Sequence, residues 1–379
     1  MIRYLLYILT LVIFLQSCSS NNTAVNKKRK QLQLRKLTNQ EKKNYHNKAE
    51  QFYNRNFRNS FSGGILVAKN GEIVFEAYNG FSNLQTQEHV HANTPIHLAS
   101  VSKTFTGIAI LKLWEEGKLK LEDSIQQYFP SFPYHGISIQ QLLSHRSGLP
   151  NYLYFMAEDT AWSKKRIATN NDVLQFMIDK KPAAYASPNR VFHYCNTNYV
   201  LLALIVEKVT QHRFPDYMKE NFFVPLGMKN TFVFSINDTA KYVPSYNYNN
   251  APFLLESLDC VYGDKNVYST VRDMFLWDLA LHDTSFISKA ITKKAFTPYS
   301  NEKPGKKNYG LGFRLFIDGK DTSVYHNGWW HGNNAVFIRS LKDTAVIITL
   351  GNKYNRGIYS SRQLVNTFSD KTVEQDLDE

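Results

Sequence analysis

The sequence is poor in cysteine, glycine and proline, and each shortage narrows what the chain can be. Three cysteines in 379 residues leave room for at most one disulfide, and a chain of this length can bury a large core without any. Eighteen glycines and twelve prolines argue against a long disordered chain. Internal repeats are absent, and the only biased stretch is a basic one near the start. With 43% hydrophobic, 14% aromatic and 20% charged residues, the composition predicts one large or two modest globular domains.

The first residues, MIRYLLYILTLVIFLQSC, have the pattern of an export signal. Arg3 precedes an apolar run over residues 4–15, which is too short to span a bilayer and is typical of a signal-peptide core. The run ends in LQSC, which resembles the lipobox of bacterial lipoproteins, although Gln16 is unusual at its position. We therefore expect residues 1–17 to be a lipoprotein signal peptide and Cys18 to carry the lipid anchor. An ordinary secretory signal is the alternative, and with either signal the protein leaves the cytoplasm. As an exported lipoprotein it is expected in the bacterial cell envelope, facing the periplasm or the exterior.

The net charge of +13 comes mostly from one segment. Residues 19–59 contain eleven Lys or Arg and two Glu, a net charge of +9, and residues 60–379 hold only +3. This distribution argues against a nucleic-acid partner. We expect residues 18–59 to be a basic tether beside the lipid anchor, where they either add attraction to anionic headgroups or serve as a solvated spacer. Residues 371–379 are expected to form an acidic tail.

The chain between these ends, residues 60–370, has strand patterns on both sides of a helical region. Asn70-Gly71 separates two apolar stretches and predicts a type I′ hairpin of half-buried antiparallel strands. An apolar helix is expected from about residue 101 to 116, followed by a mostly helical subdomain over residues 137–228. Short β-branched and aromatic runs near the end predict further strands. This order indicates a mixed α/β fold of the α+β type, in which an antiparallel sheet formed by both chain ends is flanked by helices and carries the helical insertion.

Three short motifs carry candidate catalytic residues: Ser100 to Lys103, Tyr194 to Asn196, and His326 to Gly328. The first begins the apolar helix, the second precedes a helix near residue 198, and the third lies on a predicted strand. Each motif is weak alone, because a serine three residues before a lysine also describes a capped helix with one surface lysine. Their order and their structural settings together are specific.

In order, spacing and setting, the motifs resemble those of the serine β-lactamase and penicillin-binding-protein superfamily, most closely its class C-like branch. The likeness covers about residues 60–370 and includes the segments ISIQQLLSHRSGLPNY, PLGMKNT and GDKNVYSTVRDMFLWDLAL. The branch includes β-lactamases, D-alanyl-D-alanine carboxypeptidases, D-aminopeptidases and esterases. The resemblance implies a serine hydrolase that works through an acyl-enzyme, without a cofactor or a metal ion.

The chemistry of acyl transfer accounts for the residue types in the first two motifs. A serine hydroxyl becomes a nucleophile when a base removes its proton, and residues three apart lie on one helix face, so the Lys103 amine can reach Ser100. The resemblance implies that Tyr194 shuttles the proton to the leaving group or activates the deacylating water. It also implies that Asn196 offers its amide to Lys103 or to the substrate.

The third motif is expected to bind the substrate. The resemblance implies that the backbone N–H groups of Ser100 and Trp329 bind the oxyanion, and that Gly328 keeps the strand open so that substrate backbone can lie against it. The best-known members carry Lys-Thr-Gly here, and the lysine supports binding of the substrate carboxylate. His326 replaces that lysine, and a histidine is cationic for only part of the time near neutral pH, so it is a weaker anchor for an anion. The alternative is that His326 only bonds to neighbouring side chains.

These motifs leave three functions open. We expect first a serine hydrolase that acts on an ester or a peptide-like amide. A D-alanyl-D-alanine carboxypeptidase, a D-aminopeptidase or a weak class C-type β-lactamase comes second, and a non-catalytic, lipid-tethered binding protein comes third. The expected partners are a small-molecule or peptide-like substrate and, through the anchor, a membrane.

Several other residues have simpler interpretations. His145, in SHRSGLP, is expected to shape a turn rather than take part in catalysis, and Cys195 is expected to be a buried thiol. His89 and His91 have a spacing that could hold a metal, but the sequence offers no third ligand, so we interpret them as surface histidines. Trp329 either lines the substrate cleft or packs beside the sheet.

Overall fold

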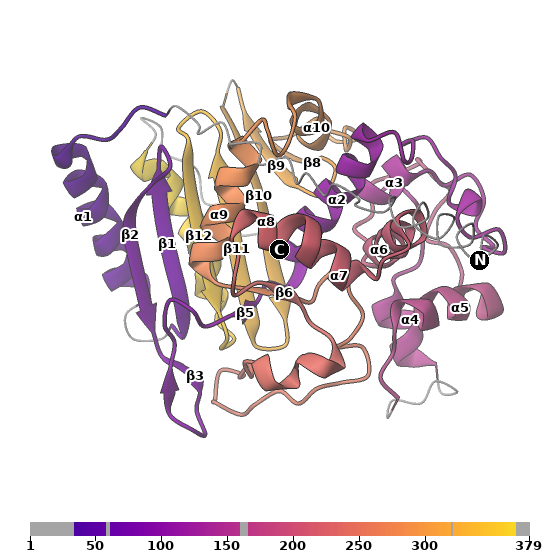
Figure 1. Ribbon diagram of the computed structural model, residues 1–379, viewed down its shortest axis with the longest axis horizontal. Coiled ribbons are helices and arrows are strands. Elements are labelled where there is room, and N and C mark those ends of the chain that lie inside the picture. Colours follow the sequence, from indigo (N-terminus) through magenta and orange to yellow (C-terminus); the bar gives the residue numbers. More distant parts are fainter. Residues whose placement is uncertain (1–33, 58–60, 160–165, 320, 369–379) are drawn as a thin grey trace, which may run out of the picture.

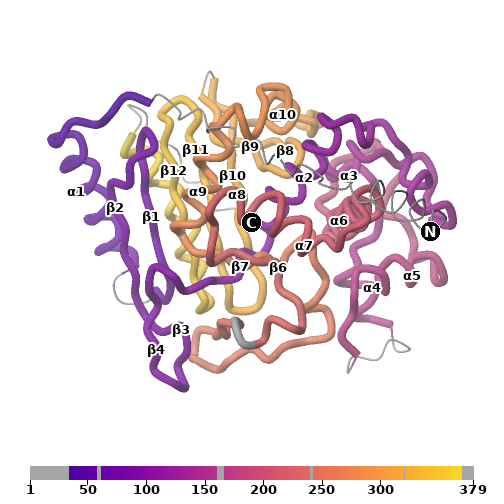
Figure 2. The backbone as a smooth tube through the Cα atoms, in the orientation of Figure 1, coloured from indigo at the N-terminus to yellow at the C-terminus, as the bar shows by residue number. Residues whose placement is uncertain are grey.

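The computed structural model describes residues 34–57, 61–159, 166–319 and 321–368, and its centre is a seven-stranded antiparallel sheet (Figure 1). The strands lie in the order β2-β1-β12-β11-β10-β9-β8. Their bounds are β1 Gly63–Lys69, β2 Glu72–Asn79, β8 Lys307–Tyr309, β9 Arg314–Asp318, β10 Asp321–Trp330, β11 Asn333–Ser340 and β12 Ala345–Gly351. Figure 2 shows the early strand β1 beside the late strand β12, so the sheet joins both parts of the chain as expected.

The hairpin between β1 and β2 turns at Asn70 and Gly71, as the sequence predicts. Both residues have the left-handed backbone that a type I′ turn requires, with φ values of 50° and 72°. The strand β1 is buried on both faces, rather than half-buried, because a hydrophobic cluster packs against each face of the sheet at this strand. Its successive residues therefore join different hydrophobic clusters, Ile65 on one face and Leu66 on the other.

Helical elements cover both faces of the sheet. The helix α1 Asn39–Asn56 and the 3-10 segment Arg356–Thr367 cover one face, where they contact β2, β11 and β12. The helix α9 Val271–His282 lies on the other face against β1 and β12. The helix α2 Lys103–Glu115 continues that layer and packs against α6 and α10 of the helical part.

Helix α1 corrects the expectation that folding begins near residue 60. It starts with a capping box, in which the Thr38 hydroxyl accepts a hydrogen bond from the Glu41 N–H and the Glu41 carboxylate accepts one from the Thr38 N–H. Only Ala49 of this helix is fully buried, so its apolar stripe is narrow and its charged residues dominate the sequence pattern. Cys18 and the expected acidic tail at 371–379 lie outside the described residues.

In the region expected to be mostly helical, the described residues form six α-helices and a π-helical segment between α7 and α8. These are α3 Ile139–Leu143, α4 Tyr152–Glu158, α5 Asn170–Lys180, α6 Thr197–Thr210, α7 Phe214–Met218, the π segment Lys219–Phe223 and α8 Val224–Leu226. The remaining elements are β3 Phe81–Asn83, β4 Glu88–His89, β5 Ile96–His97, β6 Phe232–Val233, β7 Val267–Ser269, α10 Lys289–Ala295, and 3-10 turns at Ala99–Ser102, Ile125–Gln127 and Ile236–Lys241. Within the described ranges, none of the helices has both the length and the apolar character needed to cross a membrane.

Candidate active site

Ser100 lies in the 3-10 turn Ala99–Ser102, which leads directly into α2. Ala99 has a φ of 46°, a left-handed conformation that costs an alanine on the order of 1 kcal/mol. The Ala99 N–H donates to His97 Nδ1 at 3.0 Å, which holds this conformation in place. Ser100 is therefore not a helix cap. It stands just before the positive end of α2, where a developing alkoxide is stabilised.

The Lys103 side chain is fully buried and has two hydrogen-bond partners. Its Nζ atom donates to the Ser100 Oγ at 3.0 Å and to the Asp264 carbonyl oxygen at 2.8 Å. The bond to Asp264 therefore fixes the Lys103 amine beside the Ser100 hydroxyl. The alternative of a surface lysine on a capped helix is wrong.

Tyr194 brings the second motif to the same place. The Lys103 Nζ lies 5.0 Å from the centre of the Tyr194 ring. The centres of the His145 and Tyr194 rings lie 4.3 Å apart. His145 is fully buried, has a φ of 56°, and accepts the N–H of Cys195 on its Nδ1 at 3.1 Å. His145 thus forms the turn that was expected and also holds the backbone that follows Tyr194.

Strand β10 passes directly against the turn that carries Ser100. A Cβ atom added at Gly328 would lie 2.3 Å from the Leu98 carbonyl oxygen and 3.1 Å from the Ser100 nitrogen, so only glycine permits this approach. Gly328 is therefore needed for packing against the nucleophile turn, which is a different reason from the open strand that was expected. Trp329 follows Gly328 directly in β10, and an oxyanion site formed by the N–H groups of Ser100 and Trp329 stays a prediction. The Trp329 side chain is 63% exposed, so it is not a core residue.

The burial of His326 contradicts the expectation that this residue is a partly cationic anchor for the substrate. Its side chain is fully buried, with Nδ1 2.7 Å from the Asn327 carbonyl oxygen and Nε2 3.2 Å from the Tyr309 hydroxyl. Burial, together with the nearby Arg314 and Lys103 side chains, lowers the pKa of His326 well below its usual value. The imidazole is neutral near pH 7 and both its nitrogens are used internally. It does not serve as a cationic anchor for an anion, and the alternative of bonding to neighbouring groups holds.

A permanent cation lies on the adjacent strand instead. Arg314 of β9 is paired in register with Tyr325 of β10, the residue before His326. Its guanidinium carbon lies 5.1 Å from the centre of the Tyr194 ring. A guanidinium stays charged over the physiological pH range and matches the geometry of a carboxylate. The sequence contains no motif that would have singled out this arginine, because its position depends on the pairing of the two strands.

Comparison with known proteins agrees with this arrangement. The model of the family named Beta-lactamase matches residues 54–359. The chain belongs to the Beta-lactamase family. Penicillin-binding protein 4* of Bacillus subtilis (strain 168) is 33% identical to it over 314 residues, which cover 78% of this chain and 69% of that protein. The chain is therefore a member of a superfamily of serine hydrolases.

Solved structures share the fold of this Beta-lactamase family member. A penicillin binding protein from Bacillus halodurans superposes with a TM-score of 0.73 at 24% identity, covering 86% of this chain and 99% of that one. A D-amino acid amidase from Ochrobactrum anthropi SV3 superposes with a TM-score of 0.68 at 20% identity, covering 86% of this chain and 96% of that one. At these identities the likeness shows the fold alone, and it confirms the architecture expected from the sequence.

Asn196 is the N-cap residue directly before α6 in this family member but does not hold the catalytic amine. Within the described part of the chain its side chain has no hydrogen-bond partner, whereas Lys103 bonds to Ser100 and Asp264. Of the two roles expected for Asn196, only the one toward substrate remains. Asp264 was not singled out, because the bond to Lys103 uses its backbone carbonyl, which no side-chain motif can reveal.

Among the described residues, the side chains of Cys195, Cys260, His89 and His91 form no hydrogen bond with Ser100, Lys103 or Tyr194. Cys195 and Cys260 are free thiols, and burial raises the pKa of each to about 11, so both stay protonated near neutral pH. Cys195 is buried, as expected. His89 and His91 are exposed. Over the residues that the structure describes, no three or more His, Cys, Asp or Glu side chains gather closely enough to hold a metal ion.

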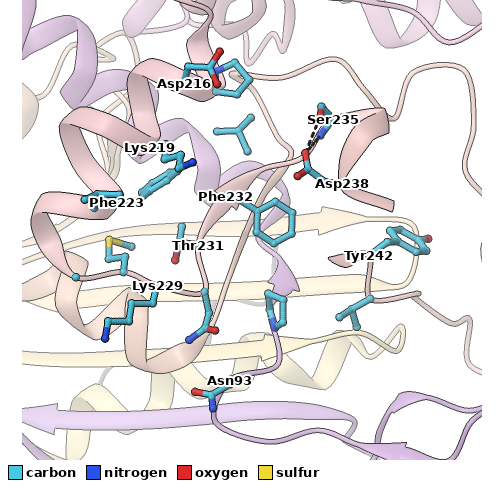
Figure 3. A pocket seen from close by; sticks show the side chains of 18 of the residues that line it. Asn93, Asp216, Lys219, Phe223, Lys229, Thr231, Phe232, Ser235, Asp238 and Tyr242 are labelled. Atoms are coloured by element: carbon cyan, nitrogen blue, oxygen red, sulfur yellow. Dashed lines mark hydrogen bonds between the residues drawn. The ribbon is translucent and has the colours of Figure 1, made fainter. Parts of the chain in front are cut away.

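A cavity of about 810 Å³ lies apart from the catalytic residues of the family member (Figure 3). Lys219 and Asp216 line it from the side of α7, and Ser235 and Asp238, joined by a hydrogen bond of 2.7 Å, line another side. Ser100 does not line this cavity, so the site is located by its chemistry rather than by volume.

Proposed function

We propose that the protein is an extracytoplasmic serine hydrolase that cleaves an ester or a peptide-like amide through an acyl-enzyme on Ser100. The observation that carries this proposal is the 3.0 Å contact between the Lys103 Nζ and the Ser100 Oγ, made by a fully buried lysine. Burying a lysine side chain is costly, and here the amine meets a hydroxyl group rather than a carboxylate. Such a pairing suits a base and a nucleophile better than it suits a structural ion pair.

In the proposed reaction, the Lys103 amine takes the proton of Ser100 as the Oγ attacks the carbonyl carbon of the substrate. The electron pair of the C=O bond moves to its oxygen, where the N–H groups of Ser100 and Trp329 stabilise the negative charge. One such donor typically lowers the barrier by about 3–4 kcal/mol. The oxyanion collapses, the bond to the leaving group breaks, and the Tyr194 hydroxyl delivers a proton to that group. The Tyr194 phenolate then takes a proton from water as the water oxygen attacks the acyl carbon. The bond from that carbon to the Ser100 Oγ breaks, and Lys103 returns its proton to restore the Ser100 hydroxyl.

A D-alanyl-D-alanine carboxypeptidase, a D-aminopeptidase or a weak class C-type β-lactamase is the second candidate, and Arg314 favours it. Peptide C-termini and β-lactams carry a carboxylate, and the Arg314 guanidinium beside Tyr194 is a suitable partner for one. The names of the relatives, a penicillin-binding protein and a D-amino acid amidase, also support this candidate. Neutral esters remain the first expectation, because the usual lysine of the third motif is replaced by a neutral His326.

Covalent labelling tests the proposal. We expect purified protein to react with a fluorophosphonate probe or a fluorescent penicillin, and Ser100→Ala to remove the label. Ser102→Ala is the matched control, because Ser102 lies in the same turn and its hydroxyl only accepts the Val267 N–H at 3.1 Å. A folded wild-type protein that neither probe labels would instead support the non-catalytic binding protein. A panel of chromogenic esters, D-amino-acid amides and a β-lactam then separates the first candidate from the second.

We propose further that Cys18 carries a lipid that anchors the protein to a membrane. The support is the apolar run over residues 4–15 followed by LQSC. One acyl chain binds a membrane only marginally, so the proposal requires the several chains of a bacterial lipoprotein. Cys18→Ser should release the protein from the membrane fraction, and a mature N-terminus at any residue other than 18 would contradict the anchor.

A further inference from the structure

Two buried histidines meet at one buried tyrosine hydroxyl beside the catalytic groups. The Tyr309 Oη lies 3.2 Å from the His145 Nε2 and 3.2 Å from the His326 Nε2. All three side chains are at most 1% exposed. His145 belongs to the loop after α3, Tyr309 ends β8, and His326 lies in β10, so the contacts join three separate parts of the fold.

The partners of His326 assign its protons. Its Nδ1 lies 2.7 Å from the Asn327 carbonyl oxygen, which can only accept a hydrogen bond, so Nδ1 carries the proton. The neutral ring then has an unprotonated Nε2, which must accept. The Tyr309 hydroxyl is the group within reach, so it donates to His326.

The partners of His145 assign the opposite tautomer. Its Nδ1 lies 3.1 Å from the Cys195 N–H and 3.2 Å from the Asn198 side-chain nitrogen, both of which donate. The proton of the neutral ring therefore sits on Nε2, which donates to the Tyr309 oxygen. The other hydroxyl beside this group, that of Tyr199, donates its own proton to the Leu143 carbonyl oxygen at 2.7 Å and leaves this assignment unchanged.

All the bonds thus run in one direction, from the Cys195 N–H through His145, Tyr309 and His326 to the Asn327 carbonyl. We infer that this chain of hydrogen bonds is a positioning device, which fixes the backbone beside Tyr194 relative to the backbone of β10 beside Gly328. His145, Tyr309 and His326 are positioning residues, since they act on the catalytic groups through the peptides that they hold. The inference rests on the proposed function only in that the groups held are those of the proposed acyl transfer.

The chain functions only with both imidazoles neutral. A proton added to the His145 Nδ1 would face two donors, and a proton added to the His326 Nε2 would face a hydroxyl that then has no acceptor. Burial is the largest cause of the lowered pKa of His145 and of His326. The nearby Lys103 and Arg314 side chains lower the pKa of both rings further. Burial, with the nearby Lys103 and Arg314 side chains, therefore keeps both rings neutral and the chain of hydrogen bonds intact near neutral pH.

Nitrogen-15 NMR of protein with labelled histidine tests the assignment without measuring activity. We expect His145 to be the Nε2–H tautomer and His326 the Nδ1–H tautomer near pH 7, with each signal identified by its loss in a His145→Gln or His326→Gln variant. Two histidines of the same tautomer, or a protonated ring, would overturn the chain. This measurement stands even if Ser100 proves unreactive, so failure of the proposed function and failure of this inference are distinguishable.

Removal of the central hydroxyl tests the positioning role. Tyr309→Phe should lower the acylation rate constant of a neutral ester by about tenfold to a hundredfold, with little change in substrate affinity, because small displacements of reacting groups are costly. Tyr128→Phe is the control, since it removes a hydroxyl that bonds to Asp123 at 2.8 Å in another part of the fold. His326→Gln, whose amide oxygen can accept from Tyr309, should retain more activity than His326→Asn. Equal acylation by Tyr309→Phe and wild type, or equal losses in the two His326 variants, would overturn the role.

Discussion

The guanidinium carbon of Arg314 lies 5.1 Å from the centre of the Tyr194 ring, whereas the imidazole of His326 is buried with both nitrogens bonded internally. A guanidinium beside the phenol of the second motif therefore comes from β9, whereas the third motif supplies no exposed imidazole there. Because an arginine keeps its charge at any pH that the protein tolerates, anion binding at this site should not follow the titration of a histidine.

Arg314→Gln should selectively weaken acylation by substrates that carry a carboxylate. A charge-assisted hydrogen bond contributes more than about 1.5 kcal/mol, so the specificity constant for the anionic member of a matched substrate pair should fall at least tenfold. The neutral member should change little, and Arg314→Lys should recover part of the loss. An anionic-to-neutral ratio that is the same in wild type and Arg314→Gln, across pH, would exclude the arginine from substrate binding.

The three catalytic groups should behave as one unit. Lys103→Met and Tyr194→Phe should each reduce turnover by orders of magnitude, and the double variant should be scarcely slower than the poorer single one. Circular dichroism and thermal unfolding of each variant provide the control for folding. Losses that multiply in the double variant would show that the two residues act in separate steps.

Gly328→Ala should impair both stability and activity, because the new methyl group would overlap the Leu98 carbonyl oxygen and crowd the Ser100 nitrogen. Overpacking of this kind costs about 1–3 kcal/mol of unfolding free energy. Gly351→Ala, whose nearest neighbouring atom would be 3.3 Å away, is a milder change in the same sheet. Urea unfolding and Ser100 labelling measure the two effects, and a Gly328→Ala protein equal to wild type in both would refute the close packing.

Stability should fall as the pH drops below about 6.5, because burial lowers the pKa of His97 to about 4. In this window the unfolded chain binds a proton that the folded protein excludes, so acid favours unfolding by about 1.4 kcal/mol per pH unit for this one group. His97→Gln should flatten the slope of unfolding free energy against pH between about 6.5 and 5 by that amount. Parallel slopes in wild type and His97→Gln would contradict a neutral, buried His97.

Helix α1 should be part of the stable fold rather than a tether. Removal of residues 1–57 would expose the hydrophobic cluster that Leu37, Ala49 and Phe57 complete, whereas removal of residues 1–33 deletes none of these three side chains. Since burial of one large apolar side chain contributes about 1.5–3 kcal/mol, the longer truncation should lose at least about 3 kcal/mol of unfolding free energy. The two truncated proteins should have clearly different melting temperatures. Identical melting temperatures would show that α1 belongs to the tether and does not stabilise the fold.

The sequence by itself determined the features that depend on short separations along the chain. The Asn70-Gly71 turn follows from the backbone freedom of two adjacent residues, and the contact of Lys103 with Ser100 follows from their spacing of three at a helix start. The order of strand and helix patterns along the chain determined that early and late strands share one sheet. Strands need partners, and the helical part separates the early strands from the late ones.

Only the tertiary structure decided the groups whose neighbours are distant in sequence. The carbonyl that holds Lys103 comes from Asp264, 161 residues away, and any residue type could supply it. His326 follows the same rule: its motif suggested a partly charged anchor, but burial and two internal bonds make it neutral. The charge that a titratable side chain carries depends on the solvent and the cations that packing places around it, and a motif does not contain that information.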